Sequence, residues 1–317
     1  MTSDGREPGV LPPLTRATGA WTPLPASAAW SVRASWSTTL LASTIPAILW
    51  TEFAGPAPGW LIVAQAAVPF ALLVATIVSR RLRPLWRFGL AMCVLLLLID
   101  VLPLTDLTAA PIQSLFGATS FDGRMQAEQT AKLLVALLMI ATLLLTGLRS
   151  RDLFLRVGSL TAPIRPVPLL GFPHADSWRR FGLIWGFGIA GALGIAQYLA
   201  VRPTATEFAA IVPMIPSIIF YAALNAFSEE MTYRAPMLAT LEPAVGSGQA
   251  LWQSAVLFGV AHYFGTPGGL AGAMLSIFMG WILGKAMLET RGLFWSWWIH
   301  FLSDVVIFDF IALALVA

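Results

Sequence analysis

Cysteine, lysine and charge are all scarce in this chain of 317 residues. The single cysteine, Cys93, excludes a disulfide framework within the chain and any metal cluster built from several cysteines. Charged residues make up only 11% of the chain, and the arginines lie between apolar segments rather than in one basic patch, so nucleic acid is not an expected partner. The first 30 residues also lack the basic and apolar pattern of a secretory signal peptide.

Hydrophobic residues, in contrast, make up 57% of the chain, and its mean hydropathy is +0.77. Most of its apolar segments are close to the length that crosses a bilayer. They span residues 36–53, 60–79, 88–104, 131–148, 181–201, 209–230, 249–264, 270–288 and 295–316. The sequence therefore predicts an all-α fold, a polytopic transmembrane bundle of about eight or nine helices in the cell membrane.

The arginines predict the orientation of these helices. One group lies in the loop at residues 80–87 and a second in the segment 149–180, two crossings later, whereas the loops between and after them hold few. Short cytoplasmic loops of membrane proteins carry an excess of Lys and Arg. Both segments are therefore expected on the cytoplasmic side, with the amino terminus inside and the carboxyl terminus outside.

Composition divides the chain into three parts. Residues 1–30, rich in Pro, Ser, Thr and Ala, are predicted to be a disordered tail. Residues 31–180 are predicted to form the N-terminal transmembrane helices and a Pro-rich cytoplasmic elbow. Residues 181–317 are predicted to form a second transmembrane core, where all the clustered polar residues lie.

Two adjacent carboxylates, Glu229 and Glu230, interrupt an apolar run. Charges within a bilayer are costly, so the pair predicts a functional site, although a helix end solvated at the membrane surface is the alternative. In a helix Glu230 can pair with Arg234 one turn later, whereas Glu229 is rotated away and lacks that partner. We expect Glu229 to be the general base and Glu230 to be structural. The helix is expected to continue to Glu242 despite Pro236, which places the site inside the bundle.

Two later stretches also place titratable groups in apolar segments. His262 follows Phe258 by one helical turn, so the phenyl ring should pack beside the imidazole. His300 and Asp304 have the same spacing and share one face. Each residue alone can be a hydrogen-bonded structural group. Together, however, the three helices predict that Glu229, both histidines and Asp304 converge on one water-filled cavity.

The three stretches together resemble the CAAX prenyl protease type 2 family of intramembrane endopeptidases, also called the CPBP or ABI family. The family pattern is Glu-Glu-x-x-x-Arg, then Phe-x-x-x-His, then His-x-x-x-Asn or Asp. It is matched here by Glu229, Glu230 and Arg234, by Phe258 and His262, and by His300 and Asp304. The resemblance covers about residues 180–316. It implies hydrolysis of membrane-associated peptides or proteins, of CAAX type or peptide precursors, near the cytoplasmic side of the bilayer.

The resemblance also implies roles for the polar residues: water activation by Glu229 and His262, oxyanion binding by His300 and Asp304, and bracing of the helix by Glu230 with Arg234. Two histidines and two carboxylates also suit a catalytic zinc ion, with Glu229, His262, His300 and Asp304 as ligands. A metal-free glutamate mechanism is the alternative. Many relatives have Asn where Asp304 stands, and Asp304 donates a hydrogen bond only when protonated, which slightly favours a metal.

Two other functions are compatible with a membrane bundle of this kind. A non-catalytic scaffold or bacteriocin-immunity protein would share the fold, but the complete set of polar residues favours catalysis. A proton-coupled transporter would also place Glu, His and Asp within membrane helices. Its usual signature of broken helices in two related halves is not evident in the sequence.

Overall fold

The computed structural model describes residues 21–25, 28–102, 110–111, 114–115, 120–265 and 268–316. Within these ranges the chain is helical apart from loops and one pair of two-residue antiparallel strands, β1 (Pro163–Ile164) and β2 (Asp176–Ser177). The α-helices are α1 (Ala29–Leu41), α2 (Ile45–Ala54), α3 (Trp60–Val78), α4 (Trp86–Leu96), α6 (Phe121–Leu145), α7 (Trp178–Val201), α8 (Ala205–Ile211), α9 (Ile215–Glu229), α10 (Ala235–Ala261), α11 (Gly269–Thr290) and α12 (Phe294–Val316). The predicted all-α class is confirmed.

Seven helical segments in the described part of the chain are long and apolar enough to cross a membrane. They are Trp60–Val78, Arg83–Val101, Phe121–Leu145, Trp178–Val201, Ala205–Phe264, Gly269–Thr290 and Phe294–Val316. The segment Ala205–Phe264 has 60 residues, far more than the roughly 20 that one crossing needs. The protein is a multi-pass membrane protein.

The apolar segment predicted at 36–53 does not form one helix. It is divided between α1 and α2, because Ser43 lies between them and accepts a hydrogen bond from the backbone N–H of Ile45 at 3.2 Å. Pro46, in the first turn of α2, lacks an amide hydrogen and so suits a helix start. The polar side chains of α1 face inward, where Thr39 donates a hydrogen bond to Gln253 of α10 at 3.1 Å.

Helices α9 and α10 are joined without a loop by a π-helical turn, η6 (Glu230–Arg234). Pro236 has no amide hydrogen to donate to the preceding turn, and the N–H of Ala235 instead bonds the carbonyl of Glu230, five residues earlier. The predicted continuation of the helix past Arg234 is therefore correct. Such wide turns occur frequently at functional sites.

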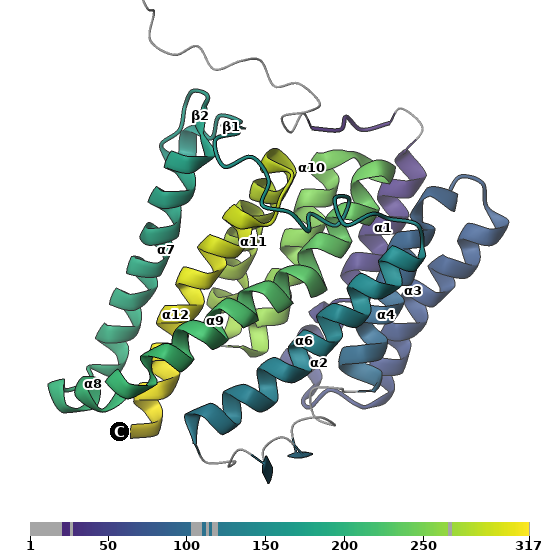
Figure 1. Ribbon diagram of the computed structural model, residues 1–317. Coiled ribbons are helices and arrows are strands. Elements are labelled where there is room, and N and C mark those ends of the chain that lie inside the picture. The colour runs from purple at the N-terminus through teal and green to yellow at the C-terminus, as the bar shows by residue number, and fades with distance from the viewer. Residues whose placement is uncertain are drawn as a thin grey trace, which may run out of the picture.

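Helix α10 is bent at Gly246, where φ is 78° and ψ is 161°. A Cβ atom there would lie 3.0 Å from the backbone nitrogen of Leu24, so both the conformation and the contact favour glycine. Before the bend, Glu242 pairs with Arg291 at the end of the bundle that carries β1 and β2. After the bend, Tyr263 donates a hydrogen bond to Glu52 of α2 at the other end (Figure 1). The chain therefore reverses within α10.

Most of the predicted disordered tail, residues 1–30, lies outside the described residues. Its part at residues 21–25 is bound to the bundle beside the bend in α10. The backbone N–H of Thr22 donates to Ser247 Oγ at 2.7 Å, and its hydroxyl donates to Glu242 Oε1 at 3.1 Å. The guanidinium of Arg165 lies 4.7 Å from the centre of the Trp21 ring. With α1 starting at Ala29, defined structure begins before the predicted boundary.

The two arginine-rich segments lie at the same end of the bundle. Arg87 donates from Nη2 to the carbonyl oxygen of Thr146 at 2.8 Å, which joins the loop at 80–87 to the residues after α6. Arg156 donates from Nε to the carbonyl oxygen of Arg291 at 2.5 Å, at the turn between α11 and α12. Figure 1 shows the segment after α6 crossing this end of the bundle before α7 begins. This arrangement is consistent with the prediction that both segments lie on the same side of the membrane.

We expect the arginine-rich end to face the cytoplasm. Single cysteines replacing Arg83 or Arg151, in a Cys93→Ser background, should resist an impermeant thiol reagent in intact cells and react after lysis. Ala205→Cys, exposed on α8 at the opposite end, is the matched control and should react in intact cells. Labelling of the first two positions without lysis would reverse the orientation.

Candidate active site

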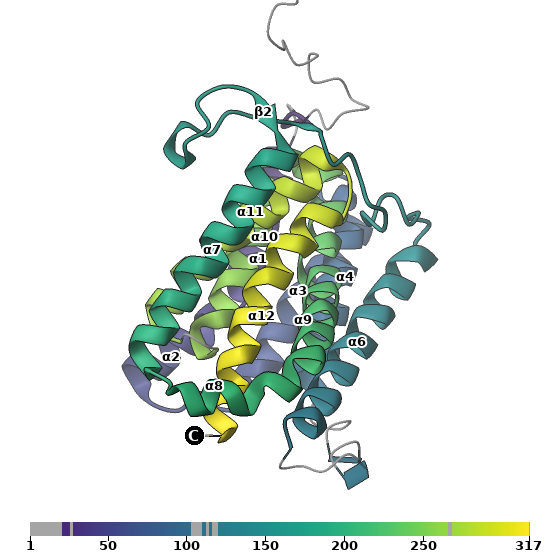
Figure 2. The ribbon, with the colours of Figure 1, turned by 60° about the vertical axis from the view of Figure 1, so that its left-hand side comes forward.

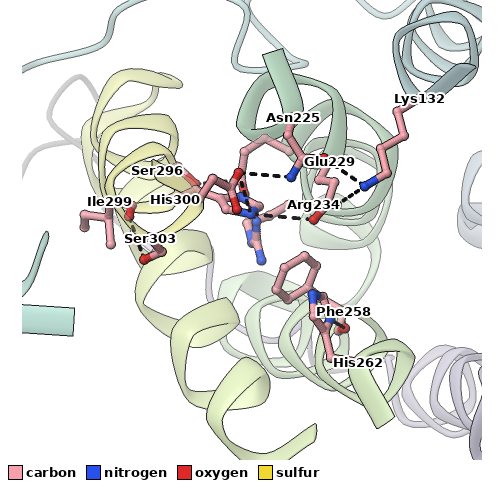
Figure 3. A network of polar contacts seen from close by, with 12 residues as sticks. Lys132, Asn225, Glu229, Arg234, Phe258, His262, Ser296, Ile299, His300 and Ser303 are labelled. Atoms are coloured by element: carbon pink, nitrogen blue, oxygen red, sulfur yellow. Dashed lines mark hydrogen bonds and ion pairs between the residues drawn. The ribbon is translucent and has the colours of Figure 1, made fainter. Parts of the chain in front are cut away.

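Elements far apart in the sequence meet inside the bundle. Helix α12 packs against both α7 and α9, and α9 packs against α6, as Figure 2 shows from the side. The turn η6 also contacts α6 and α10. Polar side chains from α6, α9, η6 and α12 therefore gather inside the bundle, with Phe258 of α10 and the half-buried His262 beside them (Figure 3).

Glu230 is fully buried and has three polar partners. Its carboxylate pairs with Arg234, which is also fully buried, so the predicted ion pair one helical turn apart is present. It accepts a hydrogen bond from the hydroxyl of Ser296 and another from Nδ1 of His300 at 2.8 Å. The Arg234 guanidinium also lies 4.4 Å from the centre of the Phe258 ring, a cation–π contact. Glu230 thus binds α12 to η6 and fixes the His300 ring.

His300 presents its second nitrogen to two other carboxylates. Nε2 lies 3.5 Å from Glu229 Oε2 and 3.7 Å from Asp304 Oδ2. These distances exceed those of a good N–H···O hydrogen bond, yet each gap is short enough for one water molecule to contact both groups. The imidazole and the two carboxylates therefore face one another closely enough for one bound oxygen atom to contact more than one of them.

Glu229 lacks Arg234 as a partner, as predicted, but it has a charge partner on another helix that was not predicted. The ammonium of Lys132 on α6 lies 3.1 Å from Glu229 Oε1, 2.8 Å from Asn225 Oδ1 and 2.8 Å from Glu128 Oε1. The prediction considered only neighbours along the same helix, whereas Lys132 belongs to the part assigned to residues 31–180. A signal was present, because the chain has only two lysines and both interrupt apolar helices, where a charge needs a partner.

Asn225 connects the lysine to Asp304. Its Oδ1 accepts from Lys132, and its Nδ2 donates to Asp304 Oδ2 at 3.0 Å. Asn225 precedes Glu229 by one turn of α9, so the helical period places the two on one face. Sequence reasoning did not assign it a role. A chain of hydrogen bonds therefore crosses the site from α6 through α9 to α12.

His262 lies at the carboxyl end of α10. Its Nδ1–H donates to the carbonyl oxygen of Phe258 at 2.9 Å, which leaves Nε2 free to accept a proton or a hydrogen bond. The Phe258 ring lies 4.5 Å from the His262 ring and 5.8 Å from the His300 ring, centre to centre. The predicted packing of Phe258 beside His262 is present, and the two histidines flank one phenyl ring.

Three of the four predicted metal ligands are already bonded to other protein groups. His300 is bonded through Nδ1 to Glu230, Glu229 is bonded to Lys132, and Asp304 is bonded to Asn225. Among the residues that the structure describes, no three His, Cys, Asp or Glu side chains are grouped so that they could hold a metal ion. The donors as placed do not fit a zinc ion, and zinc remains an untested prediction.

A cavity of about 70 Å³ adjoins the proposed base. Its lining residues are Ile99, Lys132, Val135, Ser228, Glu229, Thr232 and Tyr233. The volume has room for water, and polar groups of Ser228 and Glu229 are available to bind it. Within the described chain the buried Ser228 hydroxyl has no protein partner. Of the four residues predicted to share a water-filled cavity, Glu229 lines this one, whereas His262, His300 and Asp304 do not.

Comparison with known proteins gives one match. The family model described as Type II CAAX prenyl endopeptidase Rce1-like matches residues 211–306. This range contains Glu229, Glu230, Arg234, Phe258, His262, His300 and Asp304. No curated protein and no solved structure matches the chain. The resemblance drawn from the three motifs is confirmed: residues 211–306 are a domain of the Rce1-like type II CAAX prenyl endopeptidase (CPBP) family.

Proposed function

We propose that this protein is an intramembrane endopeptidase that hydrolyses peptide bonds of membrane-associated substrates. Membership of the CAAX endopeptidase family supports protease activity. The observation that carries the proposal is the position of His300 Nε2, 3.5 Å from one carboxylate and 3.7 Å from another within a buried site. Hydrolysis needs a group that takes a proton from water and a donor that stabilises an oxyanion, and this arrangement offers both.

Glu229 is the general base of the proposed reaction. A water molecule loses a proton to its carboxylate as the water oxygen attacks the carbonyl carbon of the scissile peptide bond. Nε2 of His262 is free because Nδ1 is bonded to the Phe258 carbonyl, and it accepts a hydrogen bond from the same water. The attack gives a tetrahedral intermediate in which the former carbonyl oxygen carries the negative charge.

His300 stabilises that oxygen. Nδ1 donates to Glu230, so Nε2 carries a proton only when His300 is the charged imidazolium, and that proton then points towards the space between Glu229 and Asp304. A donor fixed in advance at such a position contributes about 10²- to 10³-fold in kcat. The intermediate then collapses, the C–N bond breaks, and the proton held by Glu229 passes to the leaving amine. The products are a carboxyl group and an amine.

We place this site nearer the arginine-rich end of the bundle. His300 follows Phe294, the first residue of α12, by six positions, which is about 9 Å along a helix. The backbone N–H of Leu293 donates to the carbonyl oxygen of Arg156 at 2.8 Å, which fixes the start of α12 at that end. With this end in the cytoplasm, substrates with a cleavage site close to the inner interface fit best. CAAX-type carboxyl termini and membrane-anchored peptide precursors both have this property.

The test is cleavage of such peptides by the purified protein in lipid nanodiscs. Prenylated and unprenylated versions of one peptide should be offered side by side, and product formation should be followed by mass spectrometry. Cleavage by the wild-type protein, lost in Glu229→Gln, is the expected result. A folded wild-type protein that cleaves none of the peptides would instead favour the scaffold or immunity function.

The zinc prediction needs a separate measurement. Elemental analysis of purified wild-type protein and of His262→Ala would reveal a bound metal and its dependence on this side chain. If His262 is a ligand, wild-type protein should contain about one zinc ion per chain and His262→Ala clearly less. Equal and negligible zinc in both proteins would favour the metal-free glutamate mechanism.

A further inference from the structure

Among the residues that the structure describes, Lys132 is the one cation at the site that comes from outside the matched residues 211–306. An ammonium group has three N–H bonds, and each of them has an acceptor here. The acceptors are Glu128 Oε1 at 2.8 Å, Asn225 Oδ1 at 2.8 Å and Glu229 Oε1 at 3.1 Å. Figure 3 shows the lysine reaching Glu229 and Asn225 from the side opposite α12.

The contact with Glu229 restrains the proposed base. Oε1 of the carboxylate is held by Lys132, while Oε2 faces His300 Nε2 at 3.5 Å. Rotation of the carboxylate would break the first contact, so the lysine determines which oxygen faces the reacting water. Lys132 and Glu229 also line the same 70 Å³ cavity. The lysine therefore acts on the carboxylate where water can approach it.

The contact with Asn225 extends this restraint to Asp304. An amide side chain has one acceptor oxygen and one donor nitrogen. Because Lys132 donates to Oδ1, the nitrogen must point away from it, and it donates to Asp304 Oδ2 at 3.0 Å. One ammonium group thus orients two carboxylates, Glu229 directly and Asp304 through the amide.

Lys132 does not need Glu229 to neutralise its own charge. Glu128, one turn earlier on α6, already pairs with Lys132 and is half-exposed, with 47% of its side chain accessible. The Glu229 side chain is only 15% accessible. We propose that Lys132 is a positioning residue of the hydrolytic site, supplied by the N-terminal half of the protein, that sets the orientation of Glu229 and, through Asn225, of Asp304. This inference rests on the proposed endopeptidase function.

Peptide cleavage by variants of the full-length protein tests the inference. Lys132→Met should lower kcat about 100-fold with little change in KM, because the base is misplaced while the peptide-binding surface is kept. Lys132→Arg retains the charge and the hydrogen-bond donors, and its kcat should be at least tenfold higher than that of Lys132→Met.

Lys285→Met is the matched control. Lys285 is the other lysine, is buried, and pairs with Glu289 one turn later, so its loss should lower Tm but leave kcat per folded protein within about threefold.

Two results would overturn the inference: a kcat for Lys132→Met within about threefold of wild type, or an equal loss in Lys285→Met. If Lys132→Met does not fold, the same comparison of kcat is made with Lys132→Gln. Glu229→Gln in the same assay separates the two proposals, since an inactive Glu229→Gln beside an active Lys132→Met would refute only the positioning role. If the wild-type protein cleaves no peptide, the proposed endopeptidase function is refuted. A double-mutant cycle on Tm then tests the contact between Lys132 and Glu229, and additive effects of Lys132→Met and Glu229→Gln on Tm would refute that contact.

Discussion

Glu229→Gln should lower kcat for peptide cleavage at least about 100-fold while the protein stays folded. The amide keeps the shape of the side chain but cannot take a proton from water. Lys132 retains its ion pair with Glu128 and its hydrogen bond to Asn225, so the variant does not leave a buried charge without a partner. We therefore expect only a small change in Tm.

The measurement is cleavage normalised to folded protein, together with a melting curve in detergent. Glu207→Gln makes the same chemical change at a partly exposed residue in the first turn of α8, at the opposite end of the bundle, and should retain wild-type kcat. Retention of more than about a tenth of wild-type kcat by Glu229→Gln, a deficit below about 1.4 kcal/mol, would show that another group is the base.

Glu230→Gln should lower the free energy of unfolding by about 3–5 kcal/mol. Its partner Arg234 is fully buried, and among the described residues Nε and Nη2 of that guanidinium have no hydrogen-bond partner. Removal of the carboxylate charge leaves the guanidinium without its compensating anion. The hydrogen bonds from Ser296 and His300 also weaken, because a neutral amide oxygen is a poorer acceptor than a carboxylate.

Two comparisons isolate the ion pair in this result. Glu242→Gln removes a carboxylate whose partner, Arg291, is partly exposed to solvent, and should cost clearly less. The double variant Glu230→Gln with Arg234→Gln should recover part of the stability lost by Glu230→Gln alone, since no buried charge is left unpaired. A loss below about 1 kcal/mol in the Glu230→Gln variant would mean that Arg234 is compensated by other groups.

The sequence alone was sufficient for the membrane class and for contacts within single helices. Long apolar segments can satisfy their backbone groups in a bilayer only as helices or closed barrels, so hydropathy largely determines the class. The pair Glu230–Arg234 and the packing of Phe258 on His262 both follow from the 3.6-residue period, which places residues four apart on one face. The three motifs lie within apolar helical segments, so their residues could be located from the sequence alone.

Contacts between helices were decided only by the tertiary structure. Periodicity says which residues share a face but not which face of another helix packs against it. Along α6, helical periodicity places Lys132 beside Glu128 alone, and only the packing of α6 on α9 brings it to Glu229. The reversal at Gly246 is of the same kind, since the contact that requires glycine there is made by Leu24, more than two hundred residues away in the chain. What a charged group pairs with inside a bilayer depends on which helices are adjacent, and that is a property of the whole bundle.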